Sequence, residues 1–196
     1  MLKLHYAPKT RAFRILWLVE ELGQPYELVR HEMGEDDSGY RAIHPHGKFP
    51  AIEHDGVPVF ESAAICAYLG DAFPAANLGP RIGDPLRGPY LSALAYYAGV
   101  IEPAAMSAFK KWEFDRRQAG WVQWPEVEAY IRRTLSAGDY VLGDRFSAAD
   151  VLMGSAVQVV GFGAGLMAKE PPYTPYLERL AARPAFQRAR EIEAAA

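Results

Sequence analysis

The sequence predicts two domains of different class, an α/β domain over residues 1–76 and an all-α domain over residues 84–196. Extended and helical patterns alternate along the first part of the chain in the order β-α-β-α-β-β-α. Residues 75–85 are rich in glycine and proline and show no periodic pattern, which indicates a linker. Beyond this linker, the periodic segments have the apolar spacing of helices.

The first three elements predict a βαβ unit. Residues 2–6 alternate apolar and polar side chains and predict a strand, and residues 26–29 predict a second strand. The helical run between them begins near Thr10 and ends before Gly23, which suits a left-handed C-cap, and Pro25 blocks continuation of the helix. Because the two strands are joined by a helix, we expect them to be parallel.

A β-hairpin follows this unit. A polar loop over residues 34–39 and a short helical turn over residues 40–43 lead up to it. Residues 51–53 and 57–60 have extended patterns. The Asp-Gly pair at positions 55–56 is a strong signal for a tight turn between them, because glycine accepts positive φ without a Cβ penalty.

The second strand of the hairpin leads into a helix whose start is a candidate binding site. Residues 63–69 form a helical run, and Ser62 is expected to cap it by accepting a backbone N–H. Glu61 and Ser62 therefore lie beside a helix N-terminus, where unpaired N–H groups and the helix dipole favour a carboxylate ligand. This pattern predicts a site for an anionic group.

The second domain is expected to be built around one buried helix. Residues 86–113 form a long amphipathic run, with a bend expected at Gly99 and Pro103. Ser147 and Asp150 have the spacing of a capping box, and the helix that follows them is apolar on nearly all sides. We therefore assign these two residues to structure and not to chemistry. Further helices are expected after Pro125 and over residues 173–183 and 184–193.

The composition is that of an ordinary globular protein. Half of the 196 residues are hydrophobic and the net charge is −3, so no electrostatic footprint for nucleic acid and no basic run for a membrane surface is present. No apolar run approaches the roughly 20 residues that cross a bilayer, and we expect no signal peptide. The single cysteine, Cys66, cannot form an internal disulfide and is expected to be a buried apolar residue. We expect a cytoplasmic location.

Six short segments carry a pattern that none of them carries alone. They are YAPKTR at 6–11, RILWLVEELG at 14–23, GKFPAI at 47–52, ESAAI at 61–65, FSAAD at 146–150 and RPAF at 183–186. In this order and spacing, over nearly the whole chain, they resemble the cytosolic glutathione S-transferases. The resemblance implies a thioredoxin-like N-terminal domain, an all-helical C-terminal domain, glutathione as cosubstrate and a homodimer. The first loop is most similar to that of bacterial and fungal members that carry a serine there.

Glutathione reacts through its thiol, so the implied chemistry needs a donor that stabilises a thiolate. A free thiol has a pKa of about 8.5 and is mostly protonated at neutral pH. Thr10 matches the family's serine position and is the first candidate for this donor, while a helix N-cap is the alternative role for its hydroxyl. Tyr6 is the second candidate, because other subgroups use a tyrosine at the end of the first strand. Its alternative role is that of a core aromatic residue.

The remaining candidate residues are expected to bind the peptide. The resemblance implies a cis peptide bond between Phe49 and Pro50, with the Phe49 backbone pairing with the cysteinyl part of glutathione as an added strand. Glu61 and Ser62 are expected to bind the γ-glutamyl end, and their alternative role is to start a helix. Lys48 is expected to pair with the glycyl carboxylate, and its alternative is a solvated surface lysine.

The histidines show no metal-ligand spacing, and no metal is expected. His44 and His46 flank Pro45, and this pattern predicts a surface loop.

The implied activity is that of a glutathione transferase, in which bound thiolate attacks a hydrophobic electrophile or a peroxide. The second substrate is expected to lie between the two domains. One alternative is a glutathione-binding regulatory or structural protein with little turnover. Another is a glutathione-dependent isomerase or reductase, although the first loop has no cysteine for mixed-disulfide chemistry.

Overall fold

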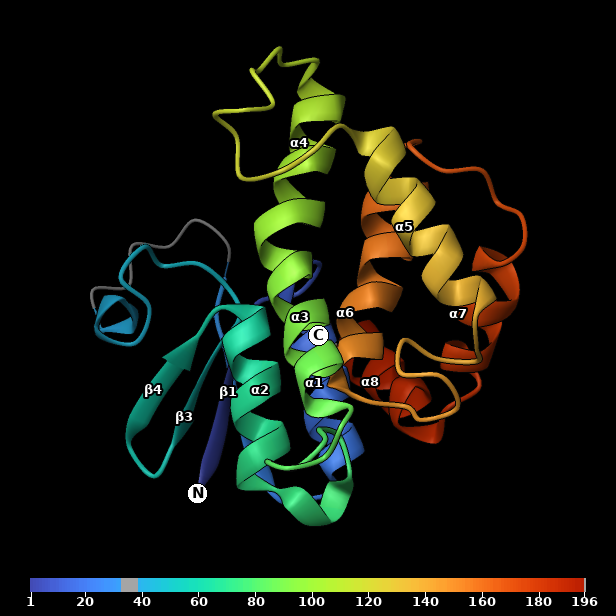
Figure 1. Ribbon diagram of the computed structural model, residues 1–196. Coiled ribbons are helices and arrows are strands. Elements are labelled where there is room, and N and C mark those ends of the chain that lie inside the picture. The colour runs from blue at the N-terminus through green and yellow to red at the C-terminus, as the bar shows by residue number, and fades with distance from the viewer. Residues whose placement is uncertain (33–38, 196) are drawn as a thin grey trace. The chain divides into compact units, whose positions relative to one another are not determined.

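The computed structural model describes residues 1–32 and 39–195, which fold into two compact units (Figure 1). The first unit consists of Met1–Leu78 together with Ala182–Ala196, and the second unit is Gly79–Ala181. The C-terminal segment therefore makes its contacts with the N-terminal part of the chain.

This grouping differs from the sequence pattern, which placed the C-terminal segment with the other helices of the second domain. The limits 1–76 and 84–196 stay a prediction for independently folding domains. The polar loop expected over residues 34–39 lies outside the described residues, apart from Gly39.

The first unit contains a four-stranded sheet in the order β2-β1-β3-β4. Its strands are β1 (Leu2–Tyr6), β2 (Tyr26–Arg30), β3 (Ala51–His54) and β4 (Val57–Phe60). β1 pairs with β2 in parallel, as the βαβ pattern predicted, and with β3 antiparallel. The β3–β4 turn places Asp55 and Gly56 at positive φ, so the predicted hairpin is confirmed.

Helices cover this sheet and complete the first unit. They are α1 (Ala12–Leu22), α2 (Ser62–Ala72) and α8 (Pro184–Ala194), with 3₁₀ turns η1 (Tyr40–Ala42) and η2 (Pro74–Ala76). Gly23 ends α1 with φ 62°, the left-handed cap expected from the sequence. α1 contacts β1, α2 and α8, and its apolar face buries Ile15, Leu16 and Leu18. The arrangement is the expected thioredoxin-like fold.

α8 is held on α1 by both charged and aromatic contacts. Arg183 forms two hydrogen bonds to the carboxylate of Glu21, at 2.6 and 2.7 Å. The Phe186 ring lies edge-on to the rings of Phe13 and Trp17, with centroids 5.6 and 5.0 Å away. These contacts explain why the C-terminal segment belongs to the first unit.

The second unit is helical throughout its regular structure. Its segments are α3 (Arg87–Tyr96), the π-helical η3 (Tyr97–Ile101), α4 (Glu102–Lys110), α5 (Trp124–Ser136), α6 (Ala148–Ser155), the π-helical η4 (Ala156–Phe162) and α7 (Tyr173–Ala181). The long run predicted over residues 86–113 is thus interrupted by a π-helical turn that contains Gly99. Among the described residues, no helix has the length and hydropathy needed to cross a bilayer.

The predicted capping box starts α6. The Ser147 hydroxyl accepts from the Ala149 N–H at 3.3 Å, and Asp150 Oδ2 accepts from the Ser147 N–H at 2.9 Å. Asp150 Oδ1 also accepts from the Val141 N–H and the Tyr176 hydroxyl, at 2.8 and 3.1 Å. Asp150 is fully buried, so these bonds replace its hydration, and the structural assignment of Ser147 and Asp150 is confirmed.

Candidate functional site

The register of the sheet brings the candidate residues of the first unit to one end. His5 of β1 lies opposite Ala51 of β3, and Ala51 lies opposite Phe60 of β4. Three segments therefore leave the sheet at the same end: the loop after β1, the Phe49–Pro50 pair before β3 and the residues after β4. Segments of the first unit that are far apart in the sequence therefore meet there.

The Phe49–Pro50 peptide bond is cis, as the resemblance implied. Pro50 is buried and Phe49 is half-buried. The Tyr40 ring stacks on the Phe49 ring with centroids 4.7 Å apart and planes 10° from parallel. The Tyr40 hydroxyl donates to the backbone carbonyl of Lys48 at 2.6 Å. Tyr40 therefore fixes both residues that precede Pro50, a role that no pattern in the sequence indicates.

Glu61, and not Ser62, is the N-cap of α2. Its backbone has φ 67° and ψ 121°, and its side chain makes no capping hydrogen bond. Ser62 is the first helical residue, so the expected capping by its hydroxyl is wrong. The first helical bond runs from the Ile65 N–H to the Glu61 carbonyl at 2.9 Å. The backbone N–H groups of the first turn thus point out of the helix end, which suits an anionic group.

His44 lies within the electrostatic influence of two charged residues of the candidate site, Lys48 and Glu61. It is buried, with its ring 5.0 Å from the ring of Phe60, so the expectation of a surface position for His44 is wrong. His46 is exposed, as expected. Burial lowers the pKa of His44, Glu61 opposes this shift, and the positive charge of Lys48 adds to it. Lys48 and Glu61 are both exposed and act on the same buried ring, so opposite charges flank the site.

Tyr6 lies in the core and its hydroxyl is already bonded. The side chain is fully buried, and the hydroxyl donates to Glu193 Oε2 at 2.7 Å. Burial and the Glu193 carboxylate raise the pKa of Tyr6 above its ordinary value, with Arg30 opposing them. In this arrangement the Tyr6 hydroxyl proton is donated to the carboxylate of Glu193 on α8.

Thr10 uses its hydroxyl to order the loop between β1 and α1. The hydroxyl donates to the Ala7 carbonyl at 2.7 Å and accepts from the Ala12 N–H at 3.1 Å. By its backbone, Arg11 is the N-cap of α1, but it makes no capping bond through its side chain. Thr10 thus satisfies one N–H of the first turn, and donation to a thiolate requires its proton to turn away from Ala7.

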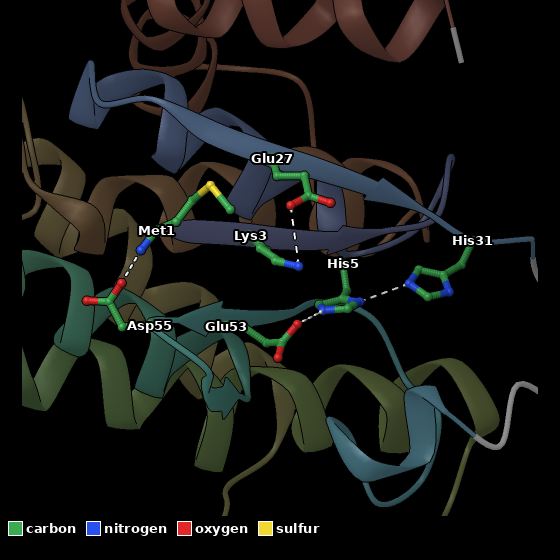
Figure 2. A network of polar contacts seen from close by, with 7 residues as sticks. All are labelled: Met1, Lys3, His5, Glu27, His31, Glu53 and Asp55. Atoms are coloured by element: carbon green, nitrogen blue, oxygen red, sulfur yellow. Dashed lines mark hydrogen bonds and ion pairs between the residues drawn. The ribbon is translucent and has the colours of Figure 1, made fainter.

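A chain of polar contacts joins His31, His5 and Glu53 (Figure 2). His5 Nδ1 lies 2.9 Å from His31 Nε2, and His5 Nε2 lies 3.0 Å from Glu53 Oε1. The His31 ring in turn lies 4.6 Å from the Tyr40 ring and 5.2 Å from the Phe49 ring. This network, from β1, β3 and the segment after β2, ties the residues before Pro50 to the sheet.

Metal and redox sites are not part of this arrangement. In the described parts of the chain, no group of three or more His, Cys, Asp or Glu side chains could hold a metal ion. Cys66 is buried in α2, and burial raises the pKa of its thiol to about 12. This thiol is inert, as expected for an apolar core residue.

The N-terminal part of the chain matches a known domain model. Residues 1–71 match the model of the glutathione S-transferase N-terminal domain. Glutathione S-transferase 3 of Schizosaccharomyces pombe is 39% identical over 71 residues, which cover 35% of this chain and 29% of that protein. The chain therefore matches less than a third of the length of this relative.

Other relatives match most of the chain. A probable glutathione S-transferase of Nicotiana tabacum is 26% identical over 172 residues, covering 85% of this chain and 71% of the tobacco protein. The maleylacetoacetate isomerase of Pseudomonas aeruginosa is 29% identical over 175 residues, covering 84% of this chain and 81% of the isomerase.

Solved structures of the same kind share the fold. The glutathione S-transferase of Actinobacillus pleuropneumoniae has a TM-score of 0.80 and 27% identity, covering 98% of this chain and 93% of that one. A sphingomonad glutathione S-transferase complexed with glutathione has a TM-score of 0.77 and 24% identity, and the match covers 99% of this chain and 100% of that one. With its cis-proline, helix start and first loop at one end of a thioredoxin-like sheet, the chain carries a glutathione S-transferase N-terminal domain over residues 1–71 and has the fold of solved glutathione S-transferases.

Proposed function

We propose that the protein binds glutathione as cosubstrate and promotes attack of its thiolate on a hydrophobic electrophile or a peroxide. The observation that carries this proposal is the meeting of three segments at one end of the sheet: the loop after β1, the backbone at Phe49 and the start of α2. A peptide carrying a thiol and two carboxylates needs a backbone edge, a helix N-terminus and a cation. All three are present in the first unit.

The tripeptide is proposed to lie along the Phe49 backbone as an added strand. Ser62 and the first-turn N–H groups of α2 bind the γ-glutamyl carboxylate, and the exposed carboxylate of Glu61 binds the ammonium group. Lys48, exposed next to Phe49, pairs with the glycyl carboxylate. The opposite charges of Lys48 and Glu61, which both act on His44, match a ligand that carries charge at both ends.

Thr10 is proposed as the donor to the thiolate. Lowering a thiol pKa by about 2 units requires roughly 2.7 kcal/mol of selective stabilisation of the anion, which a hydroxyl donor at a helix N-terminus can supply in large part. The Thr10 hydroxyl lies at the start of α1 and has to exchange the Ala7 carbonyl for the sulfur. Tyr6 suits this role less well, because its proton already serves Glu193.

The test compares three variants with the native protein. We expect Thr10→Ala to lower turnover of an electrophilic aryl halide by roughly 10²-fold, the scale found when a single oxyanion donor is removed. Thr10→Ser serves as a control that keeps the hydroxyl, and Tyr6→Phe is expected to lower turnover much less. Equal turnover by Thr10→Ala and the native protein would remove Thr10 from the mechanism.

Two alternatives remain tied to specific observations. The isomerase relative matches 84% of this chain, which favours a glutathione-dependent isomerase. Such an enzyme returns glutathione unchanged, so product formation without loss of free thiol identifies it. The bonded hydroxyl of Thr10 favours a binding protein with little turnover. Calorimetric binding of glutathione without turnover of any electrophile or peroxide identifies that case.

The assembly and location belong to the same proposal. A homodimer is proposed from the family, and sedimentation at micromolar concentration tests it. The mild net charge of −3 fits a protein whose partners are small molecules and not nucleic acid or membranes, in a cytoplasmic setting.

A further inference from the structure

We propose that Glu193, on the C-terminal helix α8, is a positioning residue that holds the loop between β1 and α1 in the conformation required for activation of the glutathione thiol. The inference rests on the proposed function, because it concerns the loop that carries Thr10. The carboxylate lies 187 positions from Tyr6 in the sequence, so only the fold brings it to this loop.

Both oxygens of Glu193 are engaged by the two ends of the first loop. Oε2 accepts from the Tyr6 hydroxyl at 2.7 Å, and Oε1 accepts from the Lys9 backbone N–H at 2.9 Å. Tyr6 is the last residue of β1, and Lys9 directly precedes Thr10. One carboxylate therefore spans from the end of the strand to the residue before the proposed donor.

The loop needs such a partner because of its backbone. Lys9 has φ 58°, a left-handed conformation that a residue with a side chain adopts only when its surroundings hold it there. The bond from its N–H to Glu193 is a charge-assisted bond that stabilises this conformation. The Thr10 hydroxyl bonds to Ala7, three residues earlier, so the same loop is fixed from both sides.

The carboxylate is itself held in place by the packing of α8. Arg183 is bonded to Glu21 of α1, and Arg188 is bonded to Glu20 at 2.7 Å. At the far end of the helix, Arg30 of β2 lies 3.5 Å from the Ala195 carbonyl. Contacts along its whole length fix α8, so Glu193 is presented to the loop by a rigid element.

This arrangement gives Tyr6 a different role from that of a thiol donor. Its hydroxyl lies in the core, and Glu193 is the acceptor that satisfies it. Tyr6 and Glu193 then act as a pair that positions the loop, and neither touches the sulfur. A pair of this kind predicts that changing either residue produces the same defect and that changing both adds little.

The experiment measures the thiol pKa of bound glutathione, from thiolate absorbance against pH, together with kcat and KM for glutathione. For Glu193→Ala we expect the thiol pKa to rise and kcat/KM for the electrophile to fall roughly tenfold, the scale of one lost charge-assisted hydrogen bond. KM for glutathione should stay within about twofold, because Lys48, Ser62 and the Phe49 backbone are untouched.

Three further variants complete the test. Glu193→Gln keeps the size and one acceptor and should lie between the native protein and Glu193→Ala. Glu191→Ala, on the exposed side of the same helix, should match the native protein. Tyr6→Phe combined with Glu193→Ala should be no worse than Glu193→Ala alone by more than about twofold.

Two outcomes separate this inference from the proposed function. If the native protein binds no glutathione, the proposed function fails and the inference falls with it. If the native protein binds glutathione and ionises its thiol, but Glu193→Ala and Glu193→Gln keep the native thiol pKa and kcat, the inference alone is overturned. A Glu193→Ala protein that does not fold leaves the decision to Glu193→Gln, whose unchanged pH profile overturns the inference in the same way.

Discussion

Tyr40 illustrates how one residue can set the geometry of the proposed glutathione site through its contacts with neighbouring residues. Its hydroxyl holds the Lys48 carbonyl, and its ring lies flat on the Phe49 ring. Burial raises the pKa of Tyr40 well above its ordinary value, so the hydroxyl remains a donor throughout the physiological pH range. Two different interactions thus fix the two residues that precede Pro50.

We expect Tyr40→Phe to weaken glutathione binding by about 1 kcal/mol, or roughly fivefold in Kd, because the stacking remains and one hydrogen bond is lost. Tyr40→Ala removes both interactions and should weaken binding further. Calorimetry measures both effects. Tyr68→Phe is the matched control, since it removes the bond to His54 at the opposite end of the strand. An equal loss of affinity in Tyr68→Phe would show that the effect of Tyr40 is not local.

The features that could be predicted from the sequence depend on residues only a few positions apart. The capping box of Ser147 and Asp150 spans four residues, and the hairpin turn at Asp55 and Gly56 spans two, so their patterns are visible in the chain. Glu193 could not be found in this way, because its partner Tyr6 lies at the other end of the sequence.

His44 and Ser62 show two other limits of such reasoning. A histidine beside a proline suggests an exposed loop, but a ring from β4 covers His44. Ser62 has the composition of a cap, but the backbone of Glu61 turns one residue earlier, and a pattern of side chains does not record backbone angles. In both cases the deciding contact or conformation is set by the tertiary fold.

At the scale of elements, the pairing of α1 with α8 depends on ion pairs of unequal burial. Arg183 and Glu21 are 27% and 8% exposed and share two bonds, whereas Arg188 and Glu20 are 50% and 13% exposed. The pair with the less exposed arginine is screened less by water, so its carboxylate depends more on its partner. The two arginines therefore contribute different amounts to the same interface.

We expect Arg183→Ala to lower the free energy of unfolding by about 2 kcal/mol, because it removes two charge-assisted bonds from a buried carboxylate. Trp17 still donates to Glu21 at 2.9 Å, which limits the loss. Arg188→Ala is the matched control on the same helix and should cost less than about 1 kcal/mol. Chemical denaturation measures both values, and an equal cost for the two variants would contradict this ranking.

At the scale of the whole molecule, the buried carboxyl group of Asp150 makes the stability of the fold depend on pH. Burial raises the pKa of Asp150 from 3.8 to about 6, although the Val141 and Ser147 N–H groups oppose the shift. The folded protein therefore binds this proton more tightly than the unfolded chain does. Its contribution to stability is complete below about pH 4 and is lost as the pH rises through about 6.

We expect the free energy of unfolding to lose up to about 3 kcal/mol from this group between pH 4 and pH 6.5. Asp150→Asn does not titrate and should lack this component, although it is less stable because its single amide oxygen cannot accept from both Val141 and Ser147. Denaturation at several pH values gives the difference between the two proteins. A difference that stays constant over this range would show that Asp150 is not protonated in the fold.

The return of α8 to the first unit has a consequence for the order of events in a cell. A ribosome that has released residues 1–78 has not yet made the helix that covers Phe13 and Trp17. Until Pro184–Ala194 emerges, these aromatic side chains and the carboxylate of Glu21 lack their contacts with α8. Residues 1–78 are thus translated well before α8, which completes their packing. We expect chaperones to bind most tightly to nascent chains that end before Pro184.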